Sequence, residues 1–101
     1  MTKVYRFQGV TFEWDEQKAE RNIQKHGITF EEAEEAAEVF FDPLAVFDNE
    51  YQNSEFREIV LGCSYRFRTL MVIHVERSDR IRIISVRKAT NQELRRYESN
   101  I

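Results

Sequence analysis

The pattern of hydrophobic and polar positions changes near Pro43, and the change divides the chain into two parts. Residues 16–26 lack proline and runs of β-branched residues, and apolar residues recur at helical spacing over 30–40, so both segments are predicted helices. After Pro43, short apolar runs rich in Val, Ile and Phe predict strands at 44–47, 56–62, 68–76 and 80–87. The polar stretch "NEYQNS" (49–54) predicts a loop.

Polar residues at the expected helix ends support these boundaries. Asp15 is a good N-cap for the first helix, and Gly27 is a natural terminator. A capping box, Thr29 with Glu32, begins the second helix, and Ile28 with Ala33 fits a hydrophobic staple around it. A second capping box, Thr90 with Glu93, precedes a short last helix. The residues expected on one face of that helix are Leu94, Tyr97 and Ile101.

Together these elements predict an α+β fold in a single domain, residues 1–101. We expect a short N-terminal strand at 11–15, two helices, an antiparallel sheet of four strands and a short C-terminal helix. The first ten residues receive no function.

The hairpin of the last two strands allows a prediction of register. A three-residue loop at 77–79 places Val75 opposite Ile81 and Ile73 opposite Ile83, which gives one continuous apolar face. The other face then pairs Glu76 with Arg80 and His74 with Arg82. A two-residue loop would set Glu76 against Ile81 and mix the faces, so we predict the three-residue loop.

Composition and charge place limits on the class of protein. With 42% hydrophobic residues and eight Phe, the chain can fill a modest core. We find no signal peptide, no apolar run of the length of a membrane span, and one cysteine, Cys63, so we expect a cytoplasmic protein without disulfides or a cysteine metal site. Residues 1–50 hold 5 Lys/Arg against 12 Asp/Glu, and residues 51–101 hold 10 against 6. The C-terminal half is therefore where an anion would bind.

The strand "RIRIISVR" (80–87) carries cations between its aliphatic residues, and two interpretations are open. Cross-strand Glu–Arg pairs are common on solvated faces. Alternatively, His74, Glu76 and the arginines are the parts of a phosphodiester-cleaving site, in which an acid and a base transfer protons and guanidinium groups hold the phosphate. With two histidines and no carboxylate cluster of ligand spacing, such a site would work without metal and would use the 2′-OH of RNA as nucleophile.

Several spaced motifs resemble the BrnT family of bacterial toxins over residues 12–98. The N-terminal block comprises "FEWD" (12–15), Lys18, Asn22, "KHG" (25–27), "FEEA" (30–33) and "VF.DP" within 39–43. The C-terminal block comprises Glu55, Arg57, Gly62, Glu76, "DRIRIIS" (79–85), "RKA" (87–89), Glu93 and Tyr97. The two blocks together are specific, although neither would suffice alone.

The resemblance implies a RelE-like ribonuclease toxin of a type II toxin–antitoxin system, which inhibits translation. It also implies neutralisation by a cognate BrnA-type antitoxin, through which alone the complex would bind operator DNA. We expect no membrane partner and no cofactor. The family's usual tyrosine and alanine are replaced here by His74 and Val86, and the first leaves the role of that position open.

From the residues and the resemblance together we expect a metal-independent endoribonuclease. The expected catalytic residues are His74, Glu76, Arg57, Arg80 and Arg82. The expected RNA-binding residues are Arg87, Lys88, Lys25 and His26, although the last two also fit a helix end whose dipole favours cations. Two alternatives stay open: a non-catalytic nucleic-acid-binding subunit and a scaffold whose cations bind an acidic protein.

Overall fold

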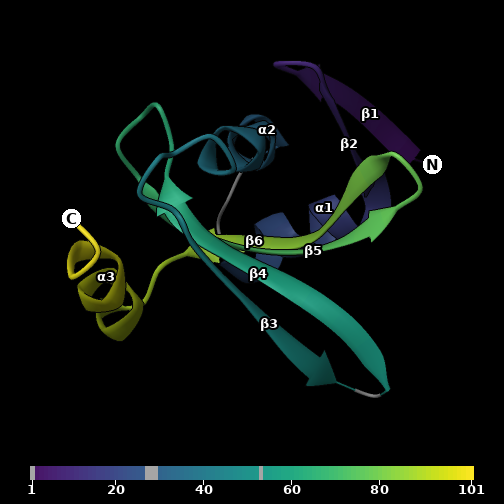
Figure 1. Cartoon of the computed structure of the whole chain (residues 1–101). Coiled ribbons are helices and arrows are strands. Elements are labelled where there is room, and N and C mark those ends of the chain that lie inside the picture. Colours follow the sequence, from purple (N-terminus) through teal and green to yellow (C-terminus); the bar gives the residue numbers. More distant parts are fainter. Residues whose placement is uncertain (1, 27–29, 53) are drawn as a thin grey trace.

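One mixed sheet of six strands organises the molecule, and three helices pack around it (Figure 1). The computed structural model describes residues 2–26, 30–52 and 54–101. The elements are β1 (Thr2–Phe7), β2 (Val10–Asp15), α1 (Glu16–His26), α2 (Phe30–Val39), β3 (Val46–Gln52), β4 (Glu55–Cys63), β5 (Thr69–Arg77), β6 (Arg80–Lys88) and α3 (Asn91–Glu98). The strand order is β1-β2-β6-β5-β4-β3. The α+β class is confirmed.

The four predicted strands form an antiparallel run, β3 to β6, and the predicted N-terminal strand is β2, but the sheet is larger than predicted because β1 and β2 join it. Strand β1 forms a hairpin with β2, and β2 runs parallel to β6, with Phe12 opposite Ile81. The sequence around either strand does not indicate this parallel pair, because the two segments lie far apart along the chain. Strand β3 also extends to Gln52, through most of the segment predicted as a loop. It is an edge strand, so its polar residues can face water.

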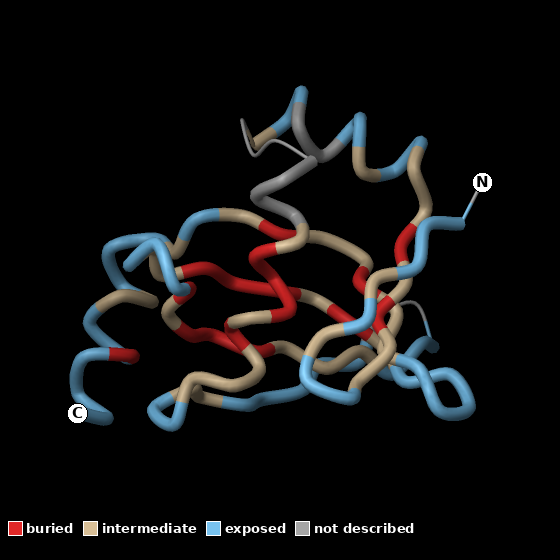
Figure 2. The backbone as a smooth tube through the Cα atoms, turned by 90° about the horizontal axis from the view of Figure 1, so that it is seen from above, coloured by how far each residue is buried: buried red, intermediate tan, exposed pale blue. Residues whose placement is uncertain are grey.

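The core lies between the sheet and α2, on what we call the covered face of the sheet. Its large, fully buried side chains are Phe12, Leu70, Val39, Val60, Val72 and Val86, and Figure 2 shows the buried positions gathered at the centre of the molecule. At Gly62 a Cβ atom would come within 2.9 Å of Val39 Cγ1, so glycine lets α2 approach β4 closely.

Helix α3 covers one end of the opposite side, which we call the open face. Tyr97 is buried there against Leu61 and Met71. Its hydroxyl donates to Asp42 Oδ2 at 2.5 Å, and the same carboxylate accepts from the Cys63 N–H at 2.8 Å. The capping box of Thr90 and Glu93 is confirmed, whereas Ile101 lies beyond the helix and is exposed, against the prediction.

The predicted register of the β5–β6 hairpin is wrong. Arg77 pairs with Arg80, which leaves a two-residue turn, Ser78-Asp79, and pairs Glu76 with Ile81 and His74 with Ile83. A bulge then shifts the register, so that Ile73 lies opposite Ser85 and Ile84 has no partner. After the bulge the covered face is apolar again, and Val72 lies opposite Val86. The hydrophobic pattern alone could not reveal the extra residue, Ile84.

The predicted start of α1 is confirmed. Asp15 caps the helix, and its Oδ1 accepts from the backbone N–H groups of Gln17 and Lys18 at 2.9 and 3.1 Å. The predicted terminator Gly27 and the Ile28–Thr29 part of the next cap lie outside the described residues.

Candidate nucleic-acid interface

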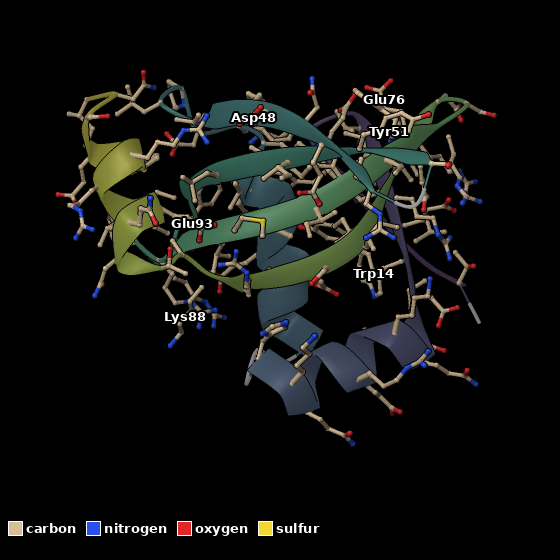
Figure 3. All side chains as sticks on the ribbon, turned by 90° about the horizontal axis from the view of Figure 1, so that it is seen from below. Trp14, Asp48, Tyr51, Glu76, Lys88 and Glu93 are labelled. Atoms are coloured by element: carbon tan, nitrogen blue, oxygen red, sulfur yellow. The ribbon has the colours of Figure 1, made fainter. Side chains whose placement is uncertain are left out.

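A row of residues that includes two arginines crosses the open face of the sheet. Glu13 on β2 lies opposite Arg82, which lies opposite Val75 on β5. Glu58 pairs with His74, so the preceding residue, Arg57, lies across from Val75 on the same side. Figure 3 looks onto this face. Arg57 and Arg82 thus flank one apolar position on a shared surface.

Glu13 holds two of the predicted site arginines. Its carboxylate oxygens lie 3.4 Å from Arg80 Nη1 and 3.5 Å from Arg82 Nη1. The Glu13 side chain is only 12% exposed and that of Arg82 16%, whereas that of Arg80 is 45% exposed. Arg82 is therefore the more strongly oriented of the two, and its guanidinium needs little further ordering to bind an anion.

A basic groove runs between α1 and β6. Strand β2 pairs with β6 only as far as Arg82, and α1 then continues along the remaining half of β6 (Figure 3). The groove has a volume of about 200 Å³, and its lining consists of Lys18, Arg21, Lys25, His26, Ile84 and Ser85. Four of these six residues are basic side chains of one helix, so the groove attracts an anionic chain.

Burial and nearby cations act in the same direction on the pKa of His26. Burial, then Lys25 and then Arg87, lowers the pKa of His26 below its ordinary value of 6.5. Lys25 and His26 line the groove together with Ile84 and Ser85, so the end of α1 lies beside β6. A neutral imidazole beside permanent cations can accept a proton at neutral pH while the cations hold an anion.

Arg87 is itself held by a carboxylate. Its Nη1 and Nη2 donate to Glu93 Oε1 and Oε2 at 2.7 and 2.9 Å, a two-point pair that raises the pKa of Arg87 and lowers that of Glu93. Glu93 Oε1 also accepts from the Thr90 N–H as part of the α3 cap. The fold of α3 thus fixes the orientation of the guanidinium.

The structure separates His74 and Glu76 from the arginines. His74 lies on the covered face and is 2% exposed, with its ring edge-to-face against Phe40 at 4.6 Å. Among the described residues neither ring nitrogen has a hydrogen-bond partner, and a carboxylate oxygen of Glu58 lies 3.7 Å from Nδ1. Burial lowers the pKa of His74 to about 4. The prediction that His74 and Glu76 face the same side as Arg82 is wrong.

The remaining predicted residues divide between two places. Arg57, Arg80 and Arg82 belong to the open face. Lys25 and His26 line the groove, and Arg87 is held by Glu93 of α3. Lys88 lies at the end of β6, below α3 in Figure 3, and lines a separate hollow beside the β4–β5 turn. Sequence reasoning missed Glu13 and Ser85. The parallel strand pair and the bulge that position them give no local pattern.

Two features are absent from the described part of the chain. There, no group of three or more His, Cys, Asp or Glu side chains is arranged to hold a metal ion. In the same residues, no helix has the length and apolar character needed to cross a membrane.

These features define a small α+β protein with a basic groove and an arginine-bearing sheet face, a class suited to binding a polyanionic chain. Residues 14–93 match a family model described as the ribonuclease toxin BrnT of type II toxin–antitoxin systems. The chain belongs to the BrnT family. Among curated proteins, no sequence matches it. Membership of a type II toxin–antitoxin family implies an antitoxin partner.

Proposed function

We propose that this chain is a metal-independent endoribonuclease that cleaves RNA in the groove between α1 and β6. The observation that carries the proposal is the groove itself, whose lining places His26 with the cations Arg21 and Lys25. Family membership supplies the ribonuclease class, and the geometry supplies a base and two cations at one place. The RelE-like character, the cytoplasmic location and the inhibition of translation are parts of the same proposal.

In the proposed reaction His26 acts as the general base. Its neutral imidazole takes the proton of a ribose 2′-OH, and the 2′-oxygen attacks the adjacent phosphorus. The bond between phosphorus and the 5′-oxygen breaks, and that oxygen takes a proton from water. The products are a 2′,3′-cyclic phosphate and a 5′-hydroxyl. Arg87 and Lys25 stabilise the charge that builds on the phosphate oxygens.

The open face extends this site along the RNA. Arg57 and Arg82, with Arg80 beside them, would bind neighbouring phosphates, and Lys88 would extend the contact at the other end. This changes two expected roles: the proton transfer expected of His74 and Glu76 moves to His26, because both residues lie on the face opposite Arg82.

Single-turnover cleavage of a short RNA by His26→Gln tests the proposal. We expect a loss of about 10²- to 10⁴-fold, the range of a lost general base. Affinity for a 2′-O-methyl RNA, which has no nucleophile, should change far less, since binding and chemistry separate in mutant kinetics. His74→Phe is the matched control and should cleave at the parent rate. If His26→Gln cleaves like the parent, the site is elsewhere. If the parent binds RNA but never cleaves it, the chain is a non-catalytic binding subunit.

We also propose that the antitoxin is of the BrnA type and contacts the open face or its rim, which would block the phosphate-binding arginines directly. Operator DNA would then be bound only through the antitoxin. Charge-steered association slows as salt rises, so the association rate of the two proteins should fall between low and high ionic strength. A rate that does not depend on salt would place the antitoxin on another surface.

A further inference from the structure

The tight turn between β4 and β5 ends in an exposed phenylalanine. Phe67 is 90% exposed, the largest exposed fraction among the exposed large hydrophobic residues of the described chain. Its φ is 60°, in the left-handed region that bulky side chains rarely adopt. The other positive-φ positions that the structure describes hold Gln8, Gly9, Ser54 and Ser78. Phe67 therefore carries a cost in backbone strain and in exposed apolar surface.

Surrounding contacts hold the turn in this conformation. The Phe67 N–H donates to the Ser64 carbonyl at 2.9 Å, and the Ser64 N–H donates to the Arg68 carbonyl at 2.9 Å. The Tyr65 N–H donates to Glu38 Oε1 of α2 at 3.1 Å. Glu35, 4% exposed, makes ion pairs with both Arg66 and Arg68. Strain that is held from several sides is common where a side chain is needed in one place.

The ring stands between two hollows and beside cations. One hollow, of about 350 Å³, has Phe67, Arg68, Thr69, Lys88, Ala89 and Leu94 as its lining. The other, of about 390 Å³, lies on the side of Pro43 and Tyr65. Lys88 and Arg68 place two basic side chains in the lining of the first hollow. An exposed ring next to arginine and lysine is the arrangement that single-stranded nucleic acids bind through base stacking.

We propose that Phe67 is a base-stacking subsite for single-stranded RNA, with the stacked base in the hollow beside Lys88. This inference rests on the proposed ribonuclease function, since it assigns a further part of the same substrate. The substrate must be single-stranded at that point, because bases in a duplex already stack on one another. Lys88 and Arg68 lie where they can contact the flanking phosphates.

Binding of a fluorescently labelled 2′-O-methyl RNA octamer tests this without depending on cleavage. Phe67→Ala should weaken binding by roughly 5- to 150-fold, the range for loss of one stacked base. Phe67→Trp keeps a ring and should bind like the parent. Phe67→Leu keeps apolar bulk but not the ring, and should be as weak as alanine. Since leucine and alanine meet the same backbone strain, their comparison isolates the ring.

A control and a scan make the result specific to one base. Phe47 on β3 is also exposed, at 59%, and Phe47→Ala should bind like the parent. In a series of octamers, a single abasic site is placed at each position in turn. The parent protein should bind weakly only to the octamers in which the missing base is the one that stacks on Phe67, at one or two positions. Phe67→Ala should be insensitive at those same positions, because the lost base and the lost ring are one contact.

Three outcomes would overturn the inference: parent-like binding by Phe67→Ala, rescue by leucine, or an abasic scan that is the same in parent and variant. A Phe67→Ala variant that binds RNA normally but escapes the antitoxin would assign the ring to a protein contact instead. Failure of the proposed cleavage site looks different. In that case His26→Gln cleaves normally, whatever Phe67 does in the binding assay.

Discussion

One of the two histidines, His74, lies on the covered face of the sheet, and the other, His26, lies in the groove beside β6. In each place the surroundings lower the pKa of the histidine. For His74 the cause is burial against Phe40, with no hydrogen bond to either ring nitrogen. For His26 burial is joined by two nearby cations, Lys25 and Arg87. The direction of a pKa shift therefore does not identify a site. The groups that cause it do, because only those around His26 can also bind substrate.

The comparison predicts that changes on the covered face alter stability and changes on the open side alter activity. Leu70 is fully buried on the covered face, and Leu70→Ala should lower the free energy of unfolding by about 2–5 kcal/mol. Denaturant unfolding measures this, with Leu44→Ala, at a 37% exposed position, as the matched control. Cleavage per folded molecule should stay at the parent value. A large loss of activity in fully folded Leu70→Ala would mean that the two sides are coupled.

The pH dependence of the free energy of unfolding tests the burial of His74. Its folded pKa of about 4 lies below the ordinary 6.5, so the folded chain binds fewer protons at this residue than the unfolded chain. Its contribution is present above about pH 6.5 and is lost as the pH falls toward 4. The loss amounts to about 3 kcal/mol at most. His74→Phe should flatten the unfolding free energy over this window relative to the parent, and an unchanged slope would show that His74 is not buried in solution.

Arg82 tests the open face. Arg82→Ala should slow single-turnover cleavage by about 10²-fold, the scale for a lost electrostatic stabiliser, while RNA affinity falls less. The free energy of unfolding should fall by about 1–3 kcal/mol, because the little-exposed Glu13 carboxylate loses Arg82 and keeps only Arg80 as an ion-pair partner. Arg82→Lys keeps the charge without the planar fork and should restore only part of the rate. Parent rates in both variants would make this arginine a solvated surface group.

Much of the fold follows from local patterns in the sequence. Asp15, Thr90 and Glu93 gave correct helix starts through their capping chemistry, and the cores of β4, β5 and β6 were visible as β-branched runs. The parallel pairing of β2 with β6 and the bulge at Ile84 were not visible. Both depend on which distant segment packs alongside, and one extra residue reverses the side on which every later side chain lies.

The candidate site was predictable only in part for the same reason. Lys25 and His26 were recognised as a pair that matters if α1 ends beside the sheet, and the structure places it there. His74 was assigned to the wrong side by a register error of one residue, although its chemistry suits proton transfer. Glu13 could not be found from spacing, because it meets Arg82 only through the parallel pair.

The pH dependence of kcat/KM for RNA cleavage tests the central claim most directly, since it reports the free enzyme's general base. If His26 is that base, the rate falls on acidification with a midpoint below pH 6.5. Lys25→Gln removes a cation that lowers the pKa of His26, so the midpoint should move to higher pH, while Lys3→Gln, at the distant β1, should leave it in place. A midpoint above 6.5, or one that Lys25→Gln does not move, would contradict the account.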